Sequence, residues 1–342
     1  MDRDIWNSLA HFQTHDLVQR AFQRKHSREL NAQRTREITS CFMQAEEYFR
    51  NAHTAAEVVR PLLLYYGVLS IGRGLILFLD KNAKEENLKP SHGLKTKDWK
   101  GILGKDLPNI LELIVEIEDG IFSELVAVTD PLQQNILPMP DGGVVIESVD
   151  YQKSLQVGDL VKFDDILSRI SCLDLTYHDV MDRRAQLRSG IIIHTEAAYI
   201  VHFINDAVIG VTTADEVRNL FHVPQHIEIG LMAPGSGCDY PNFAYRVEHS
   251  NKKYPVACPI IESINEFSIG NIIVPWPQNL YISQFSKCYL TSYVLGMLVR
   301  YFPSRWMALI RNQKGDAALP LVRAAIRHIE EDFPRMALAL LH

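Results

Sequence analysis

The sequence is short of cysteine, and no cysteine pair has the spacing of a metal or disulfide motif. Its five cysteines stand at positions 41, 172, 238, 258 and 288, an odd number with no CxxC. This usage excludes a disulfide framework and a cysteine zinc finger, and it is typical of free thiols in a reducing compartment. Excess basic charge is also lacking, because the formal net charge is −6. That balance excludes a general nucleic-acid coat but leaves room for a local basic patch.

Targeting and disorder signals are missing as well. The start, MDRDIWNSLAHF, is acidic and amphipathic, without the charged start and apolar run of a secretory signal. Hydrophobic residues make up 47% and charged residues 22%, which is close to the average of folded domains. We therefore expect a folded protein that stays in the cytoplasm.

Only one apolar run approaches the length of a membrane span, Pro61 to Leu79, and Arg73 lies inside it. An arginine at bilayer depth costs about 2.5–3.5 kcal/mol on the lenient insertion scale, and no second span accompanies it. The run is therefore predicted to be a buried core helix, with no membrane as partner.

The periodicity along the chain predicts an α+β fold. Apolar residues recur at helical spacing from Asp4 to about Leu125, with a polar surface loop from Asp80 to Trp99 and a helix from Leu107 to Glu118. After Asp130, β-branched runs predict an antiparallel sheet, interrupted by short helices at 163–171 and 213–221. The expected strands are 191–194, 199–204, 227–232, 243–248, 256–261 and 271–274. Helical spacing returns in 281–302 and 317–332.

The two helical blocks are too apolar to stand alone, because their wide apolar faces must be covered. We predict that they pack together around the inserted β-rich region. The expected divisions are 1–128 for the N-terminal helical block, 129–277 for the β-rich middle and 278–342 for the C-terminal helical block.

Two apolar helices each carry one arginine: Arg73 in the first block and Arg300 in VLGMLVRYFPSRW of the last. Arginine is almost never buried without a partner, so each side chain is expected to meet a carboxylate, carbonyl groups or a bound anion. For Arg300 we favour a carboxylate that joins the two blocks, with anion binding as the alternative.

A basic run, RAFQRKHSRELNAQRTR, extends from position 20 to 36 and holds six Lys or Arg against one Glu. On a helix these side chains would cover much of one face and could dock the phosphates of RNA, DNA or a nucleotide. The alternative is a solvated face balanced by acidic residues elsewhere. The candidate anion- or RNA-binding residues are Arg20, Arg24, Lys25, Arg28, Arg34, Arg36, Arg73, His92 and Arg300.

An arginine followed by a histidine at short spacing is typical of HEPN-type ribonucleases. Only one of three such matches lies on a strongly predicted helix, Arg323 with His328; the others are Arg20 with His26 and Arg188 with His194. In a metal-independent ribonuclease the histidine would transfer protons and the arginine would hold the phosphate. The alternative is an exposed, charged helix.

Other candidate motifs are weaker. His11 and His15 have the spacing of a metal pair on one helical face but lack the glutamate of HExxH, and Pro224 interrupts the pair His222 and His226. The loop Ala233 to Asp239 is neither a P-loop nor a nucleophile elbow and is interpreted as a turn. No metal or cofactor is expected. His92, at the end of the polar loop, is interpreted as a local hydrogen-bonding residue or as a ligand-facing one.

Four stretches together resemble the YaaC-like family of bacterial proteins. They are QAEEYFRNA (44–52), RPLLLYYGVLSIGRG (60–74), the triplet HGL (92–94) and LGMLVRYFPSRW (295–306). The resemblance spans both ends of the chain and implies a bacterial, cytoplasmic protein, but it transfers no catalytic residue.

These observations favour a binding or sensing protein without catalysis, for a partner protein, a nucleotide or RNA. Two alternatives stay open. One is a HEPN-like, metal-independent endoribonuclease of a conflict or phage-defence system, and the other is a homo-oligomeric scaffold.

Overall fold

The computed structural model describes residues 2–105, 109–130, 135–138, 144–147, 153–194, 198–206, 210–232, 242–248, 261–263, 270–311, 313 and 316–341. The chain divides into two compact units. Unit 1 combines 1–132, 155–167 and 282–342, and unit 2 combines 133–154 and 168–281. The predicted loop at 233–239, with Cys238, and also Cys258 and most of the expected strand 256–261 lie outside the described residues.

Unit 1 is mainly helical and contains both ends of the chain. Its helices are α1 (Arg3–Leu9), α2 (His15–His26), α3 (Ala32–Thr54), α4 (Arg60–Leu79), α5 (Trp99–Leu103), α6 (Ile121–Thr129), α7 (Phe163–Leu167), α10 (Gln284–Tyr301), α11 (Pro303–Ile310) and α12 (Leu319–Leu341). Short 3₁₀ turns at Ala10–Gln13, Glu85–Asn87, Ile110–Glu112 and Asp316–Ala318 connect them.

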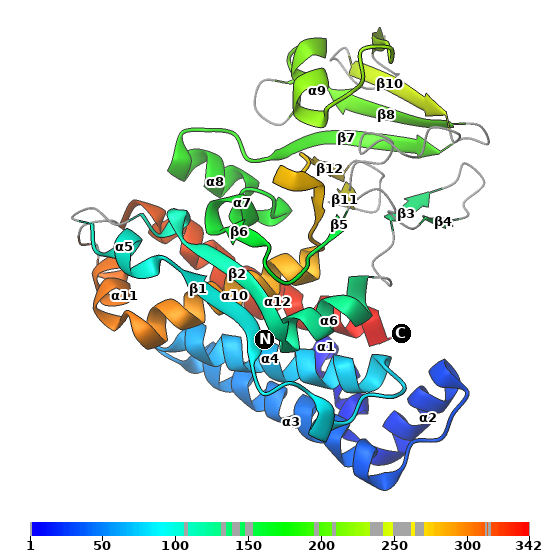
Figure 1. Cartoon of the computed structure of the whole chain (residues 1–342), viewed down its shortest axis with the longest axis vertical. Helices are drawn as coiled ribbons and strands as arrows, with labels where there is room; N and C mark the ends of the chain where they lie inside the picture. The colour runs from blue at the N-terminus through cyan, green and yellow to red at the C-terminus, as the bar shows by residue number, and fades with distance from the viewer. Residues whose placement is uncertain are drawn as a thin grey trace. The chain divides into compact units, whose positions relative to one another are not determined.

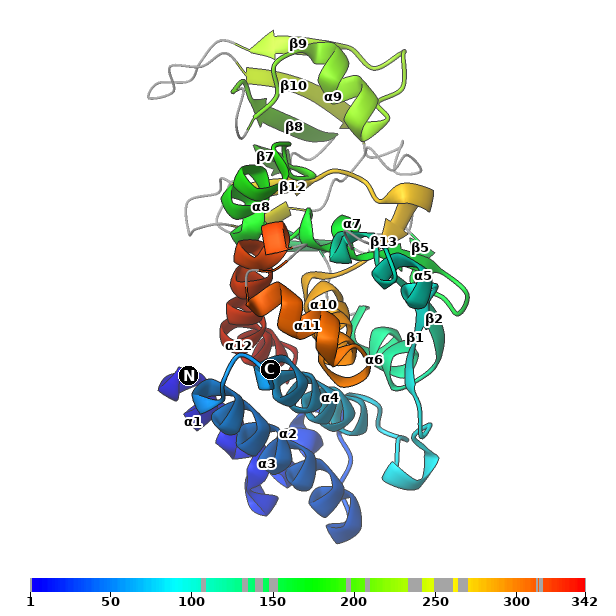
Figure 2. The same cartoon turned by 90° about the vertical axis from the view of Figure 1, so that its left-hand side faces the viewer.

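Helix α4 is the centre of unit 1, and α3, α10 and α12 pack against it (Figures 1 and 2). Two glycines let α3 approach closely, because a Cβ at Gly67 would lie 2.6 Å from the Phe49 ring and one at Gly74 would lie 2.8 Å from the Phe42 ring. A helix this apolar needs neighbouring elements over most of its surface.

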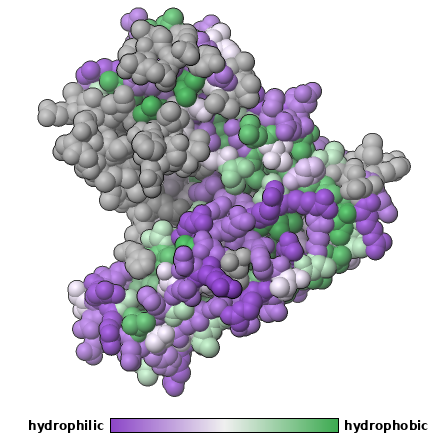
Figure 3. All heavy atoms as spheres, turned by 180° about the vertical axis from the view of Figure 1, so that it is seen from behind, coloured by the Kyte–Doolittle hydropathy of each residue, from purple (hydrophilic) through white to green (hydrophobic). Residues whose placement is uncertain are grey.

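Helix α4 is long and apolar enough to cross a membrane, but 67% of its most apolar window is buried inside the protein. It is therefore the core helix that the sequence predicts. The coloured residues of the face in Figure 3 are mostly hydrophilic, with hydrophobic side chains in smaller groups between the polar ones.

A three-stranded antiparallel sheet also belongs to unit 1, in the order β1 (His92–Lys97), β2 (Ile114–Gly120) and β6 (Leu160–Lys162). Two predictions were wrong here, because β2 replaces the expected helix 107–118 and β1 lies in the expected loop 80–99. Alternate β2 residues, Val115 and Ile117, are buried, which is the period of a half-buried strand.

Unit 2 contains a six-stranded sheet in which every pair is antiparallel, as predicted. The order is β11 (Ile261–Ser263), β12 (Gly270–Ile273), β7 (Leu187–His194), β8 (Ala198–Ile204), β10 (Asn242–Glu248) and β9 (Ile229–Met232). Smaller elements are β3 (Asn135–Pro138), β4 (Val144–Glu147), β5 (Lys153–Ser154), β13 (Leu280–Tyr281), α8 (Asp174–Met181), and 3₁₀ turns at Ser171–Leu173 and Pro277–Asn279.

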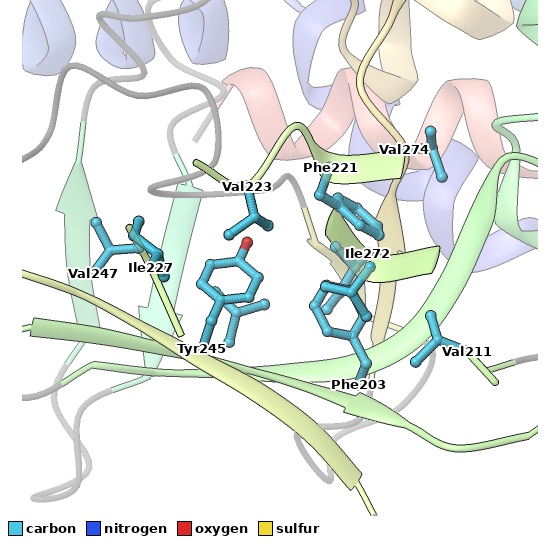
Figure 4. Packing of buried hydrophobic residues seen from close by; sticks show 11 residues of the cluster. Phe203, Val211, Phe221, Val223, Ile227, Tyr245, Val247, Ile272 and Val274 are labelled. Carbon is cyan, nitrogen blue, oxygen red and sulfur yellow. The ribbon is translucent and has the colours of Figure 1, made fainter. Parts of the chain in front are cut away.

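The core of unit 2 lies between this sheet and α9 (Ala214–Phe221). Phe203 of β8 packs on Phe221 of α9 at 4.7 Å between ring centroids, and Tyr245 of β10 lies beside Phe203 (Figure 4). Thr213 caps α9, because its Oγ1 accepts a hydrogen bond from the Glu216 amide at 3.0 Å.

The predicted fold class is confirmed. The N- and C-terminal helices form one body, and the β-rich middle of the sequence is inserted between them.

Candidate functional site

The basic run does not form one helical face. Helix α2 ends at His26, Ser27 adopts the left-handed conformation (φ 51°), and α3 begins after Asn31, whose side chain accepts from the Arg34 amide. The expectation of a single strip was therefore wrong. The turn divides the basic residues into two groups with different surroundings.

The first group binds the carboxyl end of α4. The Arg34 guanidinium donates to the carbonyl oxygens of Lys81, Leu77 and Asp80, at 2.7, 3.1 and 3.2 Å. The side chain is buried and lies over the Phe22 ring. A helix carboxyl end carries unpaired carbonyl groups and partial negative charge, so a cation there stabilises the helix.

His26 and Arg28 contribute to the same contact. The His26 ring donates from Nε2 to the Phe78 carbonyl at 2.8 Å, and Arg28 donates to the Lys81 carbonyl at 3.4 Å. These residues therefore fasten the α2–α3 corner to α4.

The second group lines an open hollow of about 970 Å³ beside α2. Three cationic side chains of α2 face it, Arg20, Arg24 and Lys25. None of the three has a hydrogen bond or ion pair to any residue that the structure describes. Burial lowers the pKa of Lys25, because desolvation penalises its charged form. The rest of the lining is His11, Phe12, Leu17, Ala21, Gln23, Ser27 and Leu341.

The described residues of this lining include no Asp, Glu or Cys. They therefore offer positive charge and hydrogen-bond donors but no pair of side-chain carboxylates for acid–base catalysis. Ser27 and Leu341 were not among the sequence candidates, and His11 was considered only as half of a metal pair. Leu341 comes from the far end of the chain. Arg36, the remaining candidate of the basic run, is exposed on α3.

The two arginines of the apolar helices have different partners. Arg73 pairs with the Glu85 carboxylate at 3.1 Å, as the sequence demands. Arg300 is exposed, lies over the ring of Tyr301 and donates to the Tyr66 hydroxyl at 3.1 Å. The prediction that Arg300 binds a carboxylate was wrong. Arg300 of α10 binds α4 through the phenol of Tyr66.

Carboxylates do join the two ends of the chain, but through other residues. Glu57 accepts both hydrogen bonds of a bidentate pair from Arg323, at 2.7 and 2.9 Å, and Glu330 of α12 pairs with His53 of α3. The Arg323 guanidinium holds the pKa of the Glu57 carboxyl below its usual value. Charge pattern alone gives no signal for pairs so distant in sequence.

His92 belongs to a buried aromatic cluster. Its Nδ1 lies 2.7 Å from the Tyr65 hydroxyl, and the rings of Tyr65 and Tyr293 lie 5.5 and 6.3 Å from its own. Burial raises the pKa of Tyr65, so the phenol keeps its proton and can donate a hydrogen bond to His92 when Nδ1 is unprotonated. The Tyr289 hydroxyl in the same cluster is buried and has no hydrogen-bond partner among the described residues.

Protonation of His92 is expected to destabilise the fold. Burial, and then the nearby Arg300 charge, lower the His92 pKa from 6.5, so the folded chain binds fewer protons than the unfolded chain as the pH falls through 6.5. The His92 contribution to stability is therefore present above that pH and decreases below it.

Urea titrations at pH 7.5 and 5.5 should show a larger loss of unfolding free energy for the wild type than for His92→Gln, whose amide oxygen can still accept from Tyr65. An NMR titration should place the His92 pKa below the ordinary value. Equal pH dependence in the two proteins would contradict the assignment.

The structure places Arg323 and His328 in separate environments. Arg323 is exposed and engaged by Glu57, whereas His328 is buried and its Nδ1 lies 2.7 Å from the Asp332 carboxylate. This contact holds the pKa of Asp332 below its usual value. Residues five apart on a helix point in directions about 140° apart, so the two side chains do not converge.

The histidine pairs also lack helical geometry. His11 lies in a 3₁₀ turn and His15 begins α2, while His222 is the left-handed C-cap of α9. The expectation that His11 and His15 share one helical face was wrong. Among the other short-spaced pairs, Arg188 is buried and bound to Glu216 at 3.2 Å.

The fold and these surfaces define an α+β protein whose helical unit carries a basic hollow and a buried aromatic cluster around His92. The chain matches the model of the YaaC-like protein family over residues 7–341 and therefore belongs to that family. A comparison with curated proteins and one with solved structures gave no match. The four sequence stretches that resemble the family all contribute to unit 1.

Proposed function

We propose that this protein is a cytoplasmic, non-catalytic binding protein whose basic hollow takes a phosphate-bearing ligand, either a nucleotide or RNA. The observation that carries the proposal is the set of Arg20, Arg24 and Lys25 around one hollow without an acidic partner among the described residues. Cations elsewhere on unit 1, such as Lys95 and Lys97, pair with glutamates.

The chemistry of the hollow favours phosphate. Guanidinium groups bind phosphate oxygens through two parallel hydrogen bonds, and a lysine adds a point charge. The volume of about 970 Å³ is at the upper end of small-ligand sites, which leaves room for a nucleotide or the end of an RNA strand. Phe12 and Leu341 give the hollow apolar surface against which a base or ribose can pack.

Binding without chemistry agrees with the lining. Acid–base catalysis needs a group that exchanges protons beside the phosphate, and a metal site needs clustered ligands. Among the residues that the structure describes, the lining supplies one histidine, His11, and no side-chain carboxylate or thiol.

The test is fluorescence anisotropy with labelled single-stranded RNA and a labelled nucleotide at several salt concentrations. We expect affinity for RNA to fall with a log–log salt slope of about −2, since three neutralised phosphates on a single strand give about −0.7 each. The variant R20Q/R24Q/K25Q should lose roughly 100-fold in affinity, about 1 kcal/mol for each contact. Its salt slope should approach zero.

A charge-matched control is K89Q/K95Q/K97Q, which removes three positive charges from β1 and the loop before it. It should bind as the wild type does. Equal losses in both variants would show only a general effect of net charge, and absence of salt-sensitive binding by the wild type would refute the proposal. RNA recovered intact after incubation is also required, because metal-independent cleavage would favour the endoribonuclease.

A further inference from the structure

A second concave surface, the α3–α4 groove, has a volume of about 310 Å³ and lies apart from the basic hollow. Helices α3 and α4 each contribute a row of side chains at helical spacing, and the turn after α4 closes one end. The lining is Ser40, Cys41, Gln44, Tyr48, Tyr66, Leu69, Ser70, Arg73 and Glu85. Several of these residues belong to the stretches 44–52 and 60–74 that resemble the family.

Arg73 lies at one end of the α3–α4 groove, where its ion pair with Glu85 is open to solvent and can be replaced. Arg73 donates from Nη2 to Glu85 at 3.1 Å and also contacts the Cys41 side chain by a hydrogen bond, and the Arg73 and Glu85 side chains are 32% and 53% exposed. An ion pair this accessible to water contributes little to stability. Cys41 lies beside it, and burial raises the pKa of its thiol to about 11, so no thiolate neutralises Arg73.

The other end of the groove is aromatic. The rings of Tyr48 and Tyr66 are stacked with their centroids 5.6 Å apart. The Arg300 bond to the Tyr66 hydroxyl fixes this ring from the side of α10. A flat aromatic face of this kind accepts a further ring by stacking or edge contact.

The middle of the groove is lined by two polar side chains, Ser70 and Gln44, which orient each other through a hydrogen bond. The Ser70 hydroxyl has one proton to donate and lies 3.0 Å from Gln44 Oε1 and 2.9 Å from the Tyr66 carbonyl of its own helix, so these two acceptors share it. The Gln44 carboxamide is thereby oriented with its oxygen on Ser70. Its NH₂ group has no partner among the described residues and is left as a donor.

We propose that the α3–α4 groove binds a small aromatic carboxylate. The ring packs against Tyr48 and Tyr66, the carboxylate replaces Glu85 on Arg73, and the Gln44 NH₂ donates to the ligand between them. Tyr66 and Arg73 are seven residues apart on α4, or about 10 Å along the axis, which suits a ring joined to its carboxylate by a short chain. The groove volume is at the small end of ligand sites.

This site is independent of the phosphate ligand proposed for the basic hollow, because the two share no lining residue. When the ligand displaces the Glu85 side chain from Arg73, the backbone around Glu85 is also affected. The Glu85 backbone amide donates to the Glu37 carboxylate of α3 at 3.2 Å, so displacement of its side chain acts on the turn that joins α4 to β1.

The experiment is titration calorimetry of the full chain with 4-hydroxyphenylacetate, which has a ring, a short arm and a carboxylate. We expect millimolar or tighter binding, and no binding of tyrosol, which lacks the carboxylate, or of acetate, which lacks the ring. R73Q should weaken binding more than about tenfold, because the bidentate partner of the carboxylate is lost.

Glu85→Gln gives the sharper test, because it removes the internal competitor for Arg73. Binding of 4-hydroxyphenylacetate should become several-fold tighter, an effect that a merely structural Glu85 would not produce, and the test holds even if R73Q folds poorly. R50Q, on the exposed face of α3, is the matched control and should bind as the wild type does.

The proposal is overturned by no binding of the acid to the wild type, by unchanged binding by folded R73Q, or by unchanged or weaker binding by E85Q. Equal binding of tyrosol and the acid would also overturn it. Loss of RNA and nucleotide binding in the basic-hollow variant with the calorimetric signal retained would separate the two sites.

Discussion

Replacing Tyr65 by alanine is expected to lower the free energy of unfolding of unit 1 by about 3–5 kcal/mol, the range for truncation of a buried aromatic side chain. Tyr65 is fully buried at the contact of α4 with α10. Its ring lies 5.5 Å from His92, 5.7 Å from Tyr293 and 6.5 Å from Tyr289 between centroids. The truncation removes one ring from all three contacts and leaves a cavity that the helices cannot close by a small shift.

The matched variant Tyr65→Phe separates packing from hydrogen bonding. It keeps the ring and removes only the hydroxyl that donates to His92, so we expect a loss of about 1 kcal/mol. Urea unfolding followed by tryptophan fluorescence measures both variants. If phenylalanine destabilises the protein as much as alanine does, the hydroxyl rather than the ring holds the cluster together.

Arg34→Gln is expected to cost about 3 kcal/mol of stability, because hydrogen bonds to charged groups contribute about 1.5–3 kcal/mol each and buried carbonyl groups lose their donor. The guanidinium donates to three carbonyl groups at the end of α4, and glutamine can reach at most a part of them. The loss should appear as a lower Tm and a lower urea midpoint.

Arg36→Gln is the control for this prediction, since Arg36 is exposed two residues further along the same helix. It should change stability by less than about 0.5 kcal/mol. The variant R20Q/R24Q/K25Q should likewise keep its Tm while losing ligand binding. The opposite pattern, with a stable Arg34 variant that fails to bind RNA, would show that Arg34 belongs to the binding surface.

The sequence predicts the inserted β-rich region and most of its strands because β-branched runs are frequent there and turn residues separate them. It misleads at β2, where LELIVEIEDG matches a helical spacing as well as an alternating one. The structure decides by pairing, because Lys95 and Lys97 of β1 bond Glu118 and Glu116 across the sheet. These cross-strand ion pairs also explain why the β1 segment looks like a polar loop. When the hydrophobic period of a short segment fits both a helix and a strand, its secondary structure depends on the segment that it pairs with, which the local sequence does not reveal.

The candidate sites, too, could be predicted from the sequence only in part. Residue types identified the cations, but composition could not separate Arg34, which binds carbonyl groups, from Arg24, which faces the basic hollow. That distinction depends on the left-handed turn at Ser27 and on the position of the α4 carboxyl end. The tyrosines of the α3–α4 groove were quoted only as part of a family motif, because aromatic residues at helical spacing are usually core.

The assembly of unit 1 from both ends of the chain also has a consequence for biosynthesis. Helix α4 ends at Leu79, and α10, which covers it, begins at Gln284, so about 200 residues are translated between them. At roughly 5–20 residues per second, the ribosome takes about 10–40 s to synthesise these residues, and the surface of α4 that packs against α10 is uncovered for that time. During that interval the nascent chain exposes part of its most apolar helix. The yield of folded protein in the cell should therefore depend strongly on chaperones that bind unfinished chains.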